Sequence, residues 1–508
     1  MQGWCRAGCI LAACLMVAGL AVIAGCTQPV QDPTLVKTSA GYVSGINQSG
    51  IRVYLGIPFA APPVGDLRWK PPAPARSWYG TKAATAYGAT CPEAQKSSPA
   101  GGAAQNTSED CLYLNVWTPA ANASAKLPVM VFFYGGGFTS VEGSMPMYNG
   151  TTLAKQGVVV VTTNYRIGAL GFLAHPGLDR ESPHNASGNY GILDQQAALK
   201  WVQKNIGAFG GDPSRVTIFG QSAGGESTYI HLVSPESKGL YSQAIVESGP
   251  FFAHGAIINA THPKDYAEAF GTGYAESLGC SGPDAITCMR NTSPAALIAA
   301  TPSSPSEFQS THTVMFEPNI DGWVLPDSLD NLYRDHREAA IPLMVGNNAN
   351  DGTTLSADAN MSVPEYRAFL ANRFGSDADV VFARYPANST AEVQLRLAQI
   401  MEDMDFIDSV KYAADSMSTI SPDTYMYRYS YIIPGQPQGA FHGSELVLLF
   451  SVPGIPVDPA VAGTVVDLWT RFAKTGDPNG GTNLIWPKYT QAAGQYLDIN
   501  TTSSVRTV

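Results

Sequence analysis

Five short runs of mostly apolar residues constrain the fold of this chain more than any other feature. They lie at Val129–Tyr134, Val158–Asn164, Val216–Phe219, Ala244–Glu247 and Pro342–Gly346. Such near-continuous runs are typical of strands that are buried on both faces of a parallel sheet. Between the second and third runs, apolar residues recur at helical spacing over residues 193–206. Strands that alternate with helices predict an α/β fold with a large, mostly parallel sheet.

Composition sets limits on the rest of the chain. Apolar residues make up 45% of the 508 positions, which is enough for a large core, and 50 glycines with 36 prolines indicate many loops. The net charge of −11 argues against a nucleic-acid partner, which would require a basic face. Near the end, Asp458 and Gly476 bracket an apolar helical pattern and predict a capped helix. We find no repeat and no long linker, so we expect one large domain.

The first 26 residues predict an export signal. An uninterrupted run of apolar and small residues from Ile10 to Ala24 is too short to span a membrane comfortably, but suits a signal peptide. The run ends in Ile23-Ala24-Gly25-Cys26, which resembles the lipobox of bacterial lipoproteins, whose cysteine carries acyl chains. We therefore expect a mature domain of residues 27–508, held in the bacterial cell envelope by a lipid on Cys26. A soluble secreted protein is the alternative.

Four cysteines follow the leader, at positions 91, 111, 280 and 288. An even number in an exported protein predicts two disulfides. Of the three possible pairings we favour the local one, Cys91–Cys111 and Cys280–Cys288, because each pair brackets a short polar loop. The cysteines have neither C-x-x-C spacing nor a nearby histidine, so no metal site is expected.

A nucleophile elbow is predicted at Gly220-Gln-Ser222-Ala-Gly224, directly after the third apolar run. The pattern G-x-S-x-G places a serine on a tight turn between a strand and a helix, where the two glycines let the chains approach closely. A glycine-rich turn with no chemical role would show the same letters. The strand in front of the turn favours Ser222 as a nucleophile.

A serine nucleophile also needs stabilisation of the oxyanion that it creates. Tyr134-Gly-Gly-Gly-Phe138 follows the first apolar run and exposes backbone N–H groups without side chains in the way. The segment lacks the Gly-Lys-Ser/Thr of a phosphate-binding loop and the spacing of a dinucleotide motif. Together with the elbow, it matches the oxyanion element of lipases and esterases.

The acid and the base must follow the serine in that order. The histidines after Ser222 are His231, His254, His262, His312, His336 and His442. His442 is favoured because it lies in a polar, glycine-flanked loop before the last predicted helix. Asp351 follows the fifth apolar run in an Asn-Asp-Gly sequence, which on its own is usually only a turn.

In these residues and in the segments around them, the chain resembles the type B carboxylesterases, the family that includes the cholinesterases. The resemblance runs from about Gly41 to Thr490 and rests on several segments: Gly56–Pro63, Glu109–Val116, Asn164–Arg166, Gly171–Leu173, Asn189–Gln195, Phe209–Pro213, Gly220–Gly225 and Phe472–Pro478. It implies an α/β-hydrolase fold with long loops that form an active-site gorge. No cofactor is implied.

The resemblance also assigns roles. It implies Ser222 as nucleophile, Asp351 as acid and His442 as base, with support from Ser248 and Glu445. The implied oxyanion hole consists of the N–H groups of Gly136, Gly137 and Ala223. The pairs Cys91–Cys111 and Cys280–Cys288 fall where the family has its first two disulfides.

Three departures from the family pattern matter. Gln221 occupies a position that is commonly Glu, so one negative charge is missing beside the imidazolium. The acid is Asp351 where cholinesterases have Glu, and the shorter side chain still fits the role. The segment between Cys91 and Cys111 contains no Trp to hold choline by cation–π attraction, so cholinesterase activity is not expected.

We therefore expect hydrolysis of a small to medium, uncharged apolar or aromatic ester through an acyl-enzyme. The acyl preference rests on Phe251, Phe252 and Phe316, which lie near gorge segments of relatives or belong to the core. Two alternatives stay open. In the first, the enzyme cleaves an amide, carbamate or lactone bond instead of an ester bond. In the second, the protein is a non-catalytic relative that acts in binding or adhesion. The expected partner is a small molecule.

Overall fold

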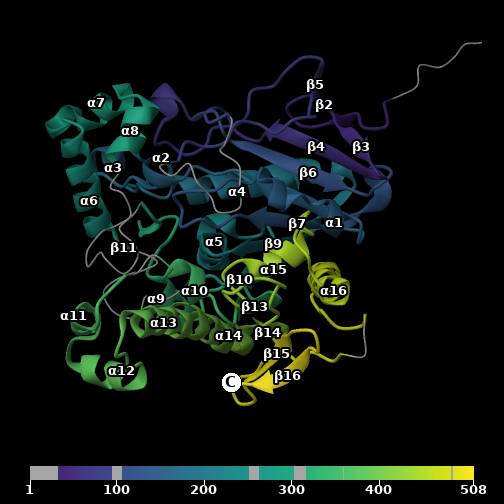
Figure 1. Cartoon of the computed structure of the whole chain (residues 1–508). Coiled ribbons are helices and arrows are strands. Elements are labelled where there is room, and N and C mark those ends of the chain that lie inside the picture. The colour runs from purple at the N-terminus through teal and green to yellow at the C-terminus, as the bar shows by residue number, and fades with distance from the viewer. Residues whose placement is uncertain (1–31, 94–105, 251–261, 302–315, 358–359, 482–483) are drawn as a thin grey trace, which may run out of the picture. The chain divides into compact units, whose positions relative to one another are not determined.

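The five apolar runs form the middle of one large sheet in the computed structural model (Figure 1). The structure describes residues 32–93, 106–250, 262–301, 316–357, 360–481 and 484–508. From one edge to the other, the strands of the sheet are β16 (Ser504–Thr507), β15 (Gln495–Ile499), β14 (Thr424–Tyr429), β13 (Leu343–Asn348), β10 (Gln243–Glu247), β9 (Gly211–Gln221), β7 (Leu127–Phe133), β8 (Val159–Thr163), β6 (Tyr113–Thr118), β4 (Ile51–Pro58) and β3 (Ile46–Gln48).

The middle of this sheet is parallel and its edges are antiparallel. Strands β8, β7, β9, β10, β13, β14 and β15 pair in parallel, whereas β16 and the β6–β4–β3 edge pair antiparallel. The predicted mostly parallel sheet is confirmed, and each apolar run coincides with a strand. Smaller pairings involve β1 (Val36–Lys37), β2 (Tyr42–Ser44), β5 (Thr81–Ala83), β11 (His262–Pro263) and β12 (Asn319–Ile320).

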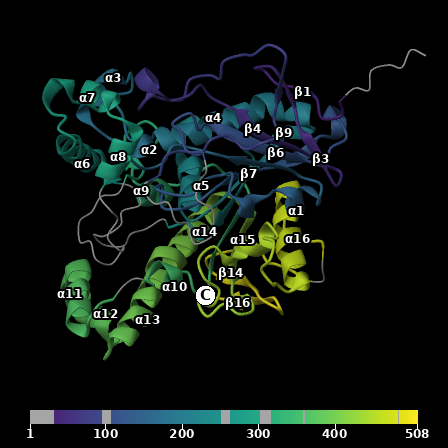
Figure 2. The same cartoon turned by 45° about the horizontal axis from the view of Figure 1, so that its top comes forward.

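Helices cover both faces of the sheet, which explains why its central strands are apolar throughout. Helices α4 (Tyr190–Asn205) and α5 (Ala223–Val233) pack on one face, and α1 (Thr151–Ala154) and α16 (Pro459–Thr475) pack on the other (Figures 1 and 2). As predicted, α16 begins at Asp458, whose carboxylate accepts the N–H of Ala460 at 2.8 Å, and ends at Gly476 with φ 76°.

The remaining helices lie in the connections between strands. They are α2 (Gly168–Phe172), α3 (Pro176–Glu181), α6 (Lys264–Ser277), α7 (Ala285–Asn291), α8 (Pro294–Ala300), α9 (Leu329–Arg334), α10 (Gly352–Leu355), α11 (Val363–Phe374), α12 (Ala378–Arg384), α13 (Thr390–Met401), α14 (Asp408–Ile420) and α15 (Ser444–Leu449). In Figures 1 and 2, α11, α12 and α13 lie together, away from α16.

Two hydrophobic cores hold these layers. The main core joins the sheet to its covering helices. A smaller core, built on Tyr366, Phe369, Leu397 and Phe406 among others, belongs to α11–α13 and to the π-helix Glu402–Ile407 that follows them. The α11–α13 segment is therefore a helical unit with packing of its own.

Both predicted disulfides are confirmed. Cys91 pairs with Cys111 and Cys280 pairs with Cys288. Residues Thr34–Val508 form one compact unit, and the predicted boundary at residue 26 lies outside the described residues. Among the residues that the structure describes, no helix has the length and apolar character needed to cross a membrane. The mixed sheet with flanking helices confirms the α/β-hydrolase fold.

Candidate active site

Ser222 lies on the sharp turn between β9 and α5, where it is the N-cap of the helix. Its φ of 60° and ψ of −127° are strained for a residue with a side chain, as is typical of functional sites. Its N–H donates to the carbonyl of Glu247 at 2.9 Å. A Cβ atom on Gly220 would lie 2.2 Å from the carbonyl oxygen of Gly224, so the turn requires glycine there. The predicted elbow is confirmed as a structure.

His442 and Asp351 meet beside this turn although 91 residues separate them. His442 Nδ1 lies 2.7 Å from Asp351 Oδ1, and the Asp351 side chain is fully buried. Asp351 follows β13 at the start of α10, and His442 precedes α15. The Phe406 ring packs against the imidazole with 5.1 Å between ring centroids. A neutral ring that donates from Nδ1 leaves Nε2 as an acceptor, which is the tautomer that a general base needs.

A network of neutral donors fixes the Asp351 carboxylate. Its Oδ2 accepts from Ser248 Oγ at 3.0 Å and from the backbone N–H of Asn348 at 2.8 Å. The Asn348 amide in turn donates to the carbonyl of Phe441 at 2.8 Å and to the carboxyl group of Glu445. Asn348 therefore ties the loop of the acid to the loop of the base.

Two further carboxyl groups lie buried near the acid. Burial, followed by repulsion from Asp351, raises the pKa of Glu445 to about 7. Burial, followed by repulsion from Glu445, raises the pKa of Glu247 well above its ordinary value, and Glu247 accepts from the indole N–H of Trp469. Both shifts favour the neutral form of the carboxyl group, which limits the negative charge around Asp351.

Gln221 contacts the other nitrogen of the base. Its amide Nε2 lies 3.1 Å from His442 Nε2, and its side chain is buried. Because Nε2 of the neutral ring is an acceptor, the amide donates this hydrogen bond. An ionised Glu at this position could only accept a hydrogen bond. Having Gln221 in place of Glu therefore changes the hydrogen bonding of His442 as well as its charge environment.

The glycine loop after β7 runs directly against the serine. A Cβ atom on Gly135 would lie 2.8 Å from the Cβ atom of Ser222, and Gly136 has φ 94°. Ala223 is the first residue of α5, so its N–H belongs to the unpaired donors of a helix N-terminus. The structure thus brings the loop of Gly136 and Gly137 to the turn that carries Ser222 and Ala223.

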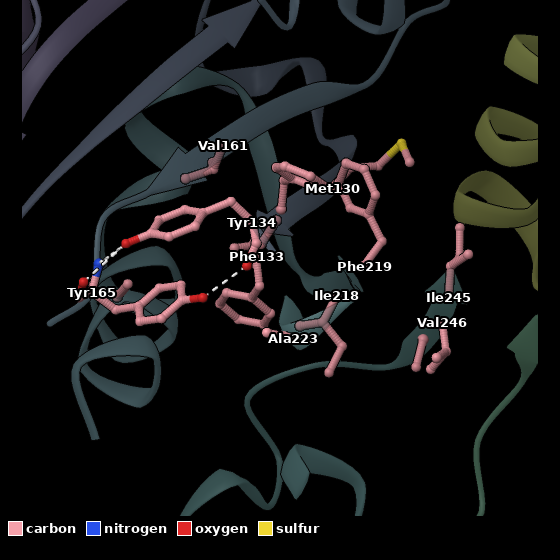
Figure 3. Close-up of a cluster of buried hydrophobic side chains, with 14 of the residues drawn as sticks. Met130, Phe133, Tyr134, Val161, Tyr165, Ile218, Phe219, Ala223, Ile245 and Val246 are labelled. Atoms are coloured by element: carbon pink, nitrogen blue, oxygen red, sulfur yellow. Dashed lines mark hydrogen bonds between the residues drawn. The ribbon is translucent and has the colours of Figure 1, made fainter. Parts of the chain in front are cut away.

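A tyrosine pair anchors this loop (Figure 3). Tyr134 and Tyr165 stack with 4.2 Å between ring centroids. The hydroxyl of Tyr134 donates to the carbonyl of Tyr165 at 2.9 Å, and the hydroxyl of Tyr165 donates to the carbonyl of Tyr134 at 2.8 Å. Figure 3 shows the two bonds running in opposite directions, with Ala223 in the same cluster. Since Tyr134 precedes the glycines, the pair fixes where the loop leaves the sheet.

Sequence reasoning missed the roles of Tyr165 and Asn348. Their positions in the sequence could have indicated these roles. Each residue lies at or just after the carboxyl end of a predicted parallel strand, where the ligand sites of α/β sheets form. Asn164-Tyr-Arg was recognised only as a family segment. Its Arg166 forms a buried ion pair with Asp194 at 2.7 Å, which is structural.

Other predicted residues lie elsewhere. Phe316 packs in the core against Phe270 and Tyr274 of α6. Phe251, Phe252 and Cys26 lie outside the described residues. Within the described part of the chain, no group of His, Cys, Asp and Glu side chains is arranged to hold a metal ion.

Comparison with known proteins identifies the family. The model of the Carboxylesterase family matches residues 32–508. The fumonisin B1 esterase of Sphingopyxis macrogoltabida is 38% identical over 476 residues, which cover 90% of this chain and 85% of the relative. The cholinesterase of Mus musculus is 32% identical over 520 residues, which cover 93% of this chain and 84% of the relative. A solved structure titled PNB esterase is 33% identical with a TM-score of 0.82, and the match covers 93% of this chain and 97% of the chain in that structure.

The fold, the serine on its strained turn and these matches agree with one another. Ester hydrolysis is the activity named for all three relatives. The chain therefore belongs to the carboxylesterase family and is a serine hydrolase of carboxylic esters.

Proposed function

We propose that Ser222, His442 and Asp351 hydrolyse an ester through an acyl-enzyme. The observation that carries this proposal is the 2.7 Å contact between His442 Nδ1 and Asp351 Oδ1 beside the strained turn of Ser222. Asp351 holds the imidazole in the tautomer that accepts at Nε2. The glycine loop and the N-terminus of α5 supply N–H groups at the same turn, which suits an oxyanion hole of Gly136, Gly137 and Ala223.

The reaction proceeds in two steps. Ser222 Oγ attacks the ester carbonyl and passes its proton to His442 Nε2, and the carbonyl oxygen becomes an oxyanion. The tetrahedral intermediate collapses, the C–O bond to the alcohol breaks, and His442 returns the proton to the leaving alcohol. Water then attacks the acyl-enzyme with the same proton transfers and releases the acid and free Ser222.

Gln221 must adjust during this cycle. The single lone pair of Nε2 accepts from one donor at a time, so the Gln221 amide must turn away before Nε2 can take the proton of Ser222. A half-turn of the amide presents Oε1 instead and restores the hydrogen bond. Gln221 is therefore a positioning residue that can bond both forms of the base, whereas a Glu carboxylate favours the charged form alone.

We propose a small to medium, uncharged apolar or aromatic ester as substrate. The relatives named above act on different esters, so family membership leaves the substrate open. The absence of Trp between Cys91 and Cys111 supports a substrate other than a choline ester. A series of chromogenic esters with increasing acyl length tests this preference, and faster cleavage of a cationic choline ester than of any neutral ester would contradict it.

Replacing the nucleophile tests the mechanism. For Ser222→Ala we expect kcat on a chromogenic short-chain ester to fall by about 10⁴-fold or more. Ser227→Ala on the same helix is a matched control, since Ser227 donates to the carbonyl of Ala223 within α5. A serine-directed phosphonate should label the wild type and the control, but not Ser222→Ala. Full activity of Ser222→Ala would contradict the mechanism.

We also propose that the protein is exported and carries a lipid on Cys26. This proposal rests on the apolar run and the Ile-Ala-Gly-Cys segment of the leader. Mass spectrometry of the mature N-terminus tests it. A diacylated or triacylated Cys26 is expected, and an unmodified N-terminus downstream of Cys26 would show simple secretion.

A further inference from the structure

A polar cavity of about 450 Å³ lies where the α11–α13 helical unit meets the sheet. The lining residues come from α12 and α13, from Arg428 of β14, from the Asn350 loop and from the π-helix Glu402–Ile407. The volume lies in the range of roughly 300–1,000 Å³ that is typical of small-molecule sites. Ser222 and His442 are not among its lining residues, so the cavity is separate from the candidate active site.

Three arginines line this cavity, each from a different element: Arg384 from α12, Arg396 from α13 and Arg428 from β14. Arg396 Nε donates to the carbonyl of Pro386 at 2.9 Å, and its Nη1 donates to the Gln399 side chain at 2.7 Å. Its other guanidinium N–H groups have no protein partner in the described part of the chain. Arg396 is thus held in place with donors left for a ligand.

Arg428 is held in a similar way. Its Nη2 donates to Glu402 Oε1 at 2.6 Å and to the carbonyl of Ala349 at 3.3 Å. Its Nε and Nη1 groups bond no other described side chain or carbonyl. Two guanidinium groups from different elements are therefore held at the cavity, each with N–H groups that bond no other described residue.

The acidic residues of the cavity do not cancel this positive charge. Glu402 and Asp403 are the two carboxyl groups among the lining residues. Asp403 accepts from the hydroxyl of Tyr385 at 2.6 Å. Burial raises the pKa of Glu402 to about 8 although the neighbouring Arg428 lowers it, and repulsion by Asp351 and Asp403 adds to the rise. Three guanidinium groups therefore line the cavity against two carboxyl groups, one of which pairs with Arg428 and the other of which accepts from Tyr385.

We propose that this cavity is a second binding site, which takes a small anion with two or three negative charges. Guanidinium groups match carboxylate and phosphate oxygens in paired hydrogen bonds, and arginines from three different elements around one cavity suit a ligand with more than one anionic group. The position at the junction of two packed units and against a π-helix is also typical of ligand sites. The ligand chemistry is shared by polycarboxylates and by polyphosphates.

Calorimetric titration of the full protein tests this site with two probes, citrate and pyrophosphate, at constant ionic strength set by NaCl. We expect saturable binding of at least one probe with a Kd below about 1 mM. Binding of citrate alone identifies a carboxylate site, and binding of pyrophosphate alone identifies a phosphate site. Ser222→Ala should bind the same probe equally well, so the result does not depend on the proposed mechanism of ester hydrolysis.

Arg396→Gln should weaken this binding about tenfold or more, because it removes charge-assisted donors but keeps the length of the side chain. Arg334→Gln is the matched control, since Arg334 is exposed at the end of α9 and its ion-pair partner among the described residues is its neighbour Asp335. If Arg396→Gln does not fold, the exposed Arg384→Gln replaces it, with the same expected direction. Absence of saturable binding of both probes, or equal losses in the cavity variant and in Arg334→Gln, would overturn the proposal.

Discussion

At the scale of single residues, the base is bonded at both ring nitrogens. His442 Nδ1 faces Asp351 at 2.7 Å, and His442 Nε2 faces the amide of Gln221 at 3.1 Å. The contact with Asp351 orients the ring that we propose as the general base before substrate arrives, and the Gln221 amide must release Nε2 before that atom takes up the serine proton.

Replacing the acid by its amide tests the tautomer argument. In Asp351→Asn the amide group can keep the bonds from Ser248 and Asn348 while it turns its NH2 group toward His442 Nδ1. The ring must then carry its proton on Nε2 and cannot accept from Ser222, so kcat should fall by roughly 10³–10⁴-fold. Steady-state kinetics on a chromogenic ester measures this change.

Ser248→Ala is the control for that variant. It removes one hydrogen bond to Asp351 Oδ2 but leaves the carboxylate that faces the histidine. We expect a loss of about tenfold or less. Equal losses in the two variants would show that Asp351 acts only through packing.

Glu445 makes stability depend on pH. Its pKa is about 7 in the fold against an ordinary value of 4.5, because of burial and the nearby Asp351. Between these values the folded protein keeps a proton that the unfolded chain releases, so stability falls as pH rises from about 4.5 to about 7. In Glu445→Gln this loss should shrink by roughly 1–3 kcal/mol in the free energy of unfolding.

Urea unfolding at about pH 5 and at about pH 8 measures the effect. Glu276→Gln on the exposed face of α6 is the control, and it should keep the wild-type difference between the two pH values. The interpretation of Glu445 is wrong if its variant shows the same difference as this control.

At the scale of elements, the glycine loop that we propose as part of the oxyanion hole is anchored from a neighbouring strand. The loop leaves β7 at Tyr134, and the residue that holds it, Tyr165, follows β8. Parallel neighbours deliver their following residues to the same edge of the sheet, so the anchor and the loop meet without any contact that is local in sequence.

Tyr165→Phe tests this anchor. The variant loses the hydroxyl that donates to the carbonyl of Tyr134 and leaves that buried acceptor unsatisfied. We expect kcat to fall by about 3- to 30-fold with a smaller change in KM, because the loop stabilises the transition state. Tyr366→Phe is the matched control, since its hydroxyl also donates to a backbone carbonyl but lies in the second core. An equal loss of kcat in both variants would contradict the role of the pair.

Helices and strands were predicted from the sequence more completely than the contacts between them. The five apolar runs and the capped helix after Asp458 agree with the structure, because burial on both faces and helix capping leave local patterns. The helical unit of α11–α13 was not predicted, since its small core depends on which helices meet. The predicted gorge loops include segments outside the described residues, and the gorge stays a prediction.

At the scale of the whole molecule, the two disulfides close loops of 20 and 8 residues. Their removal should destabilise the fold by about 3 kcal/mol for the Cys91–Cys111 bond and about 2.5 kcal/mol for the Cys280–Cys288 bond in the chain-entropy model. Double Cys→Ser variants at each pair, compared by urea unfolding, measure these costs. Unchanged unfolding midpoints in both would show that neither bond stabilises the protein.

Local sequence patterns were enough to predict the fold class, the serine on its turn and the order of the candidate acid and base, because strand periodicity and glycine-dependent turns are local properties. The sequence also pointed to Asp351 and His442, but only the tertiary structure brought them within 2.7 Å of each other. The pairing of Tyr134 with Tyr165, the bridge from Asn348 and the arginine-lined cavity depend on contacts between distant segments. Such contacts follow from how the strands are ordered in the sheet, and no local pattern encodes that order.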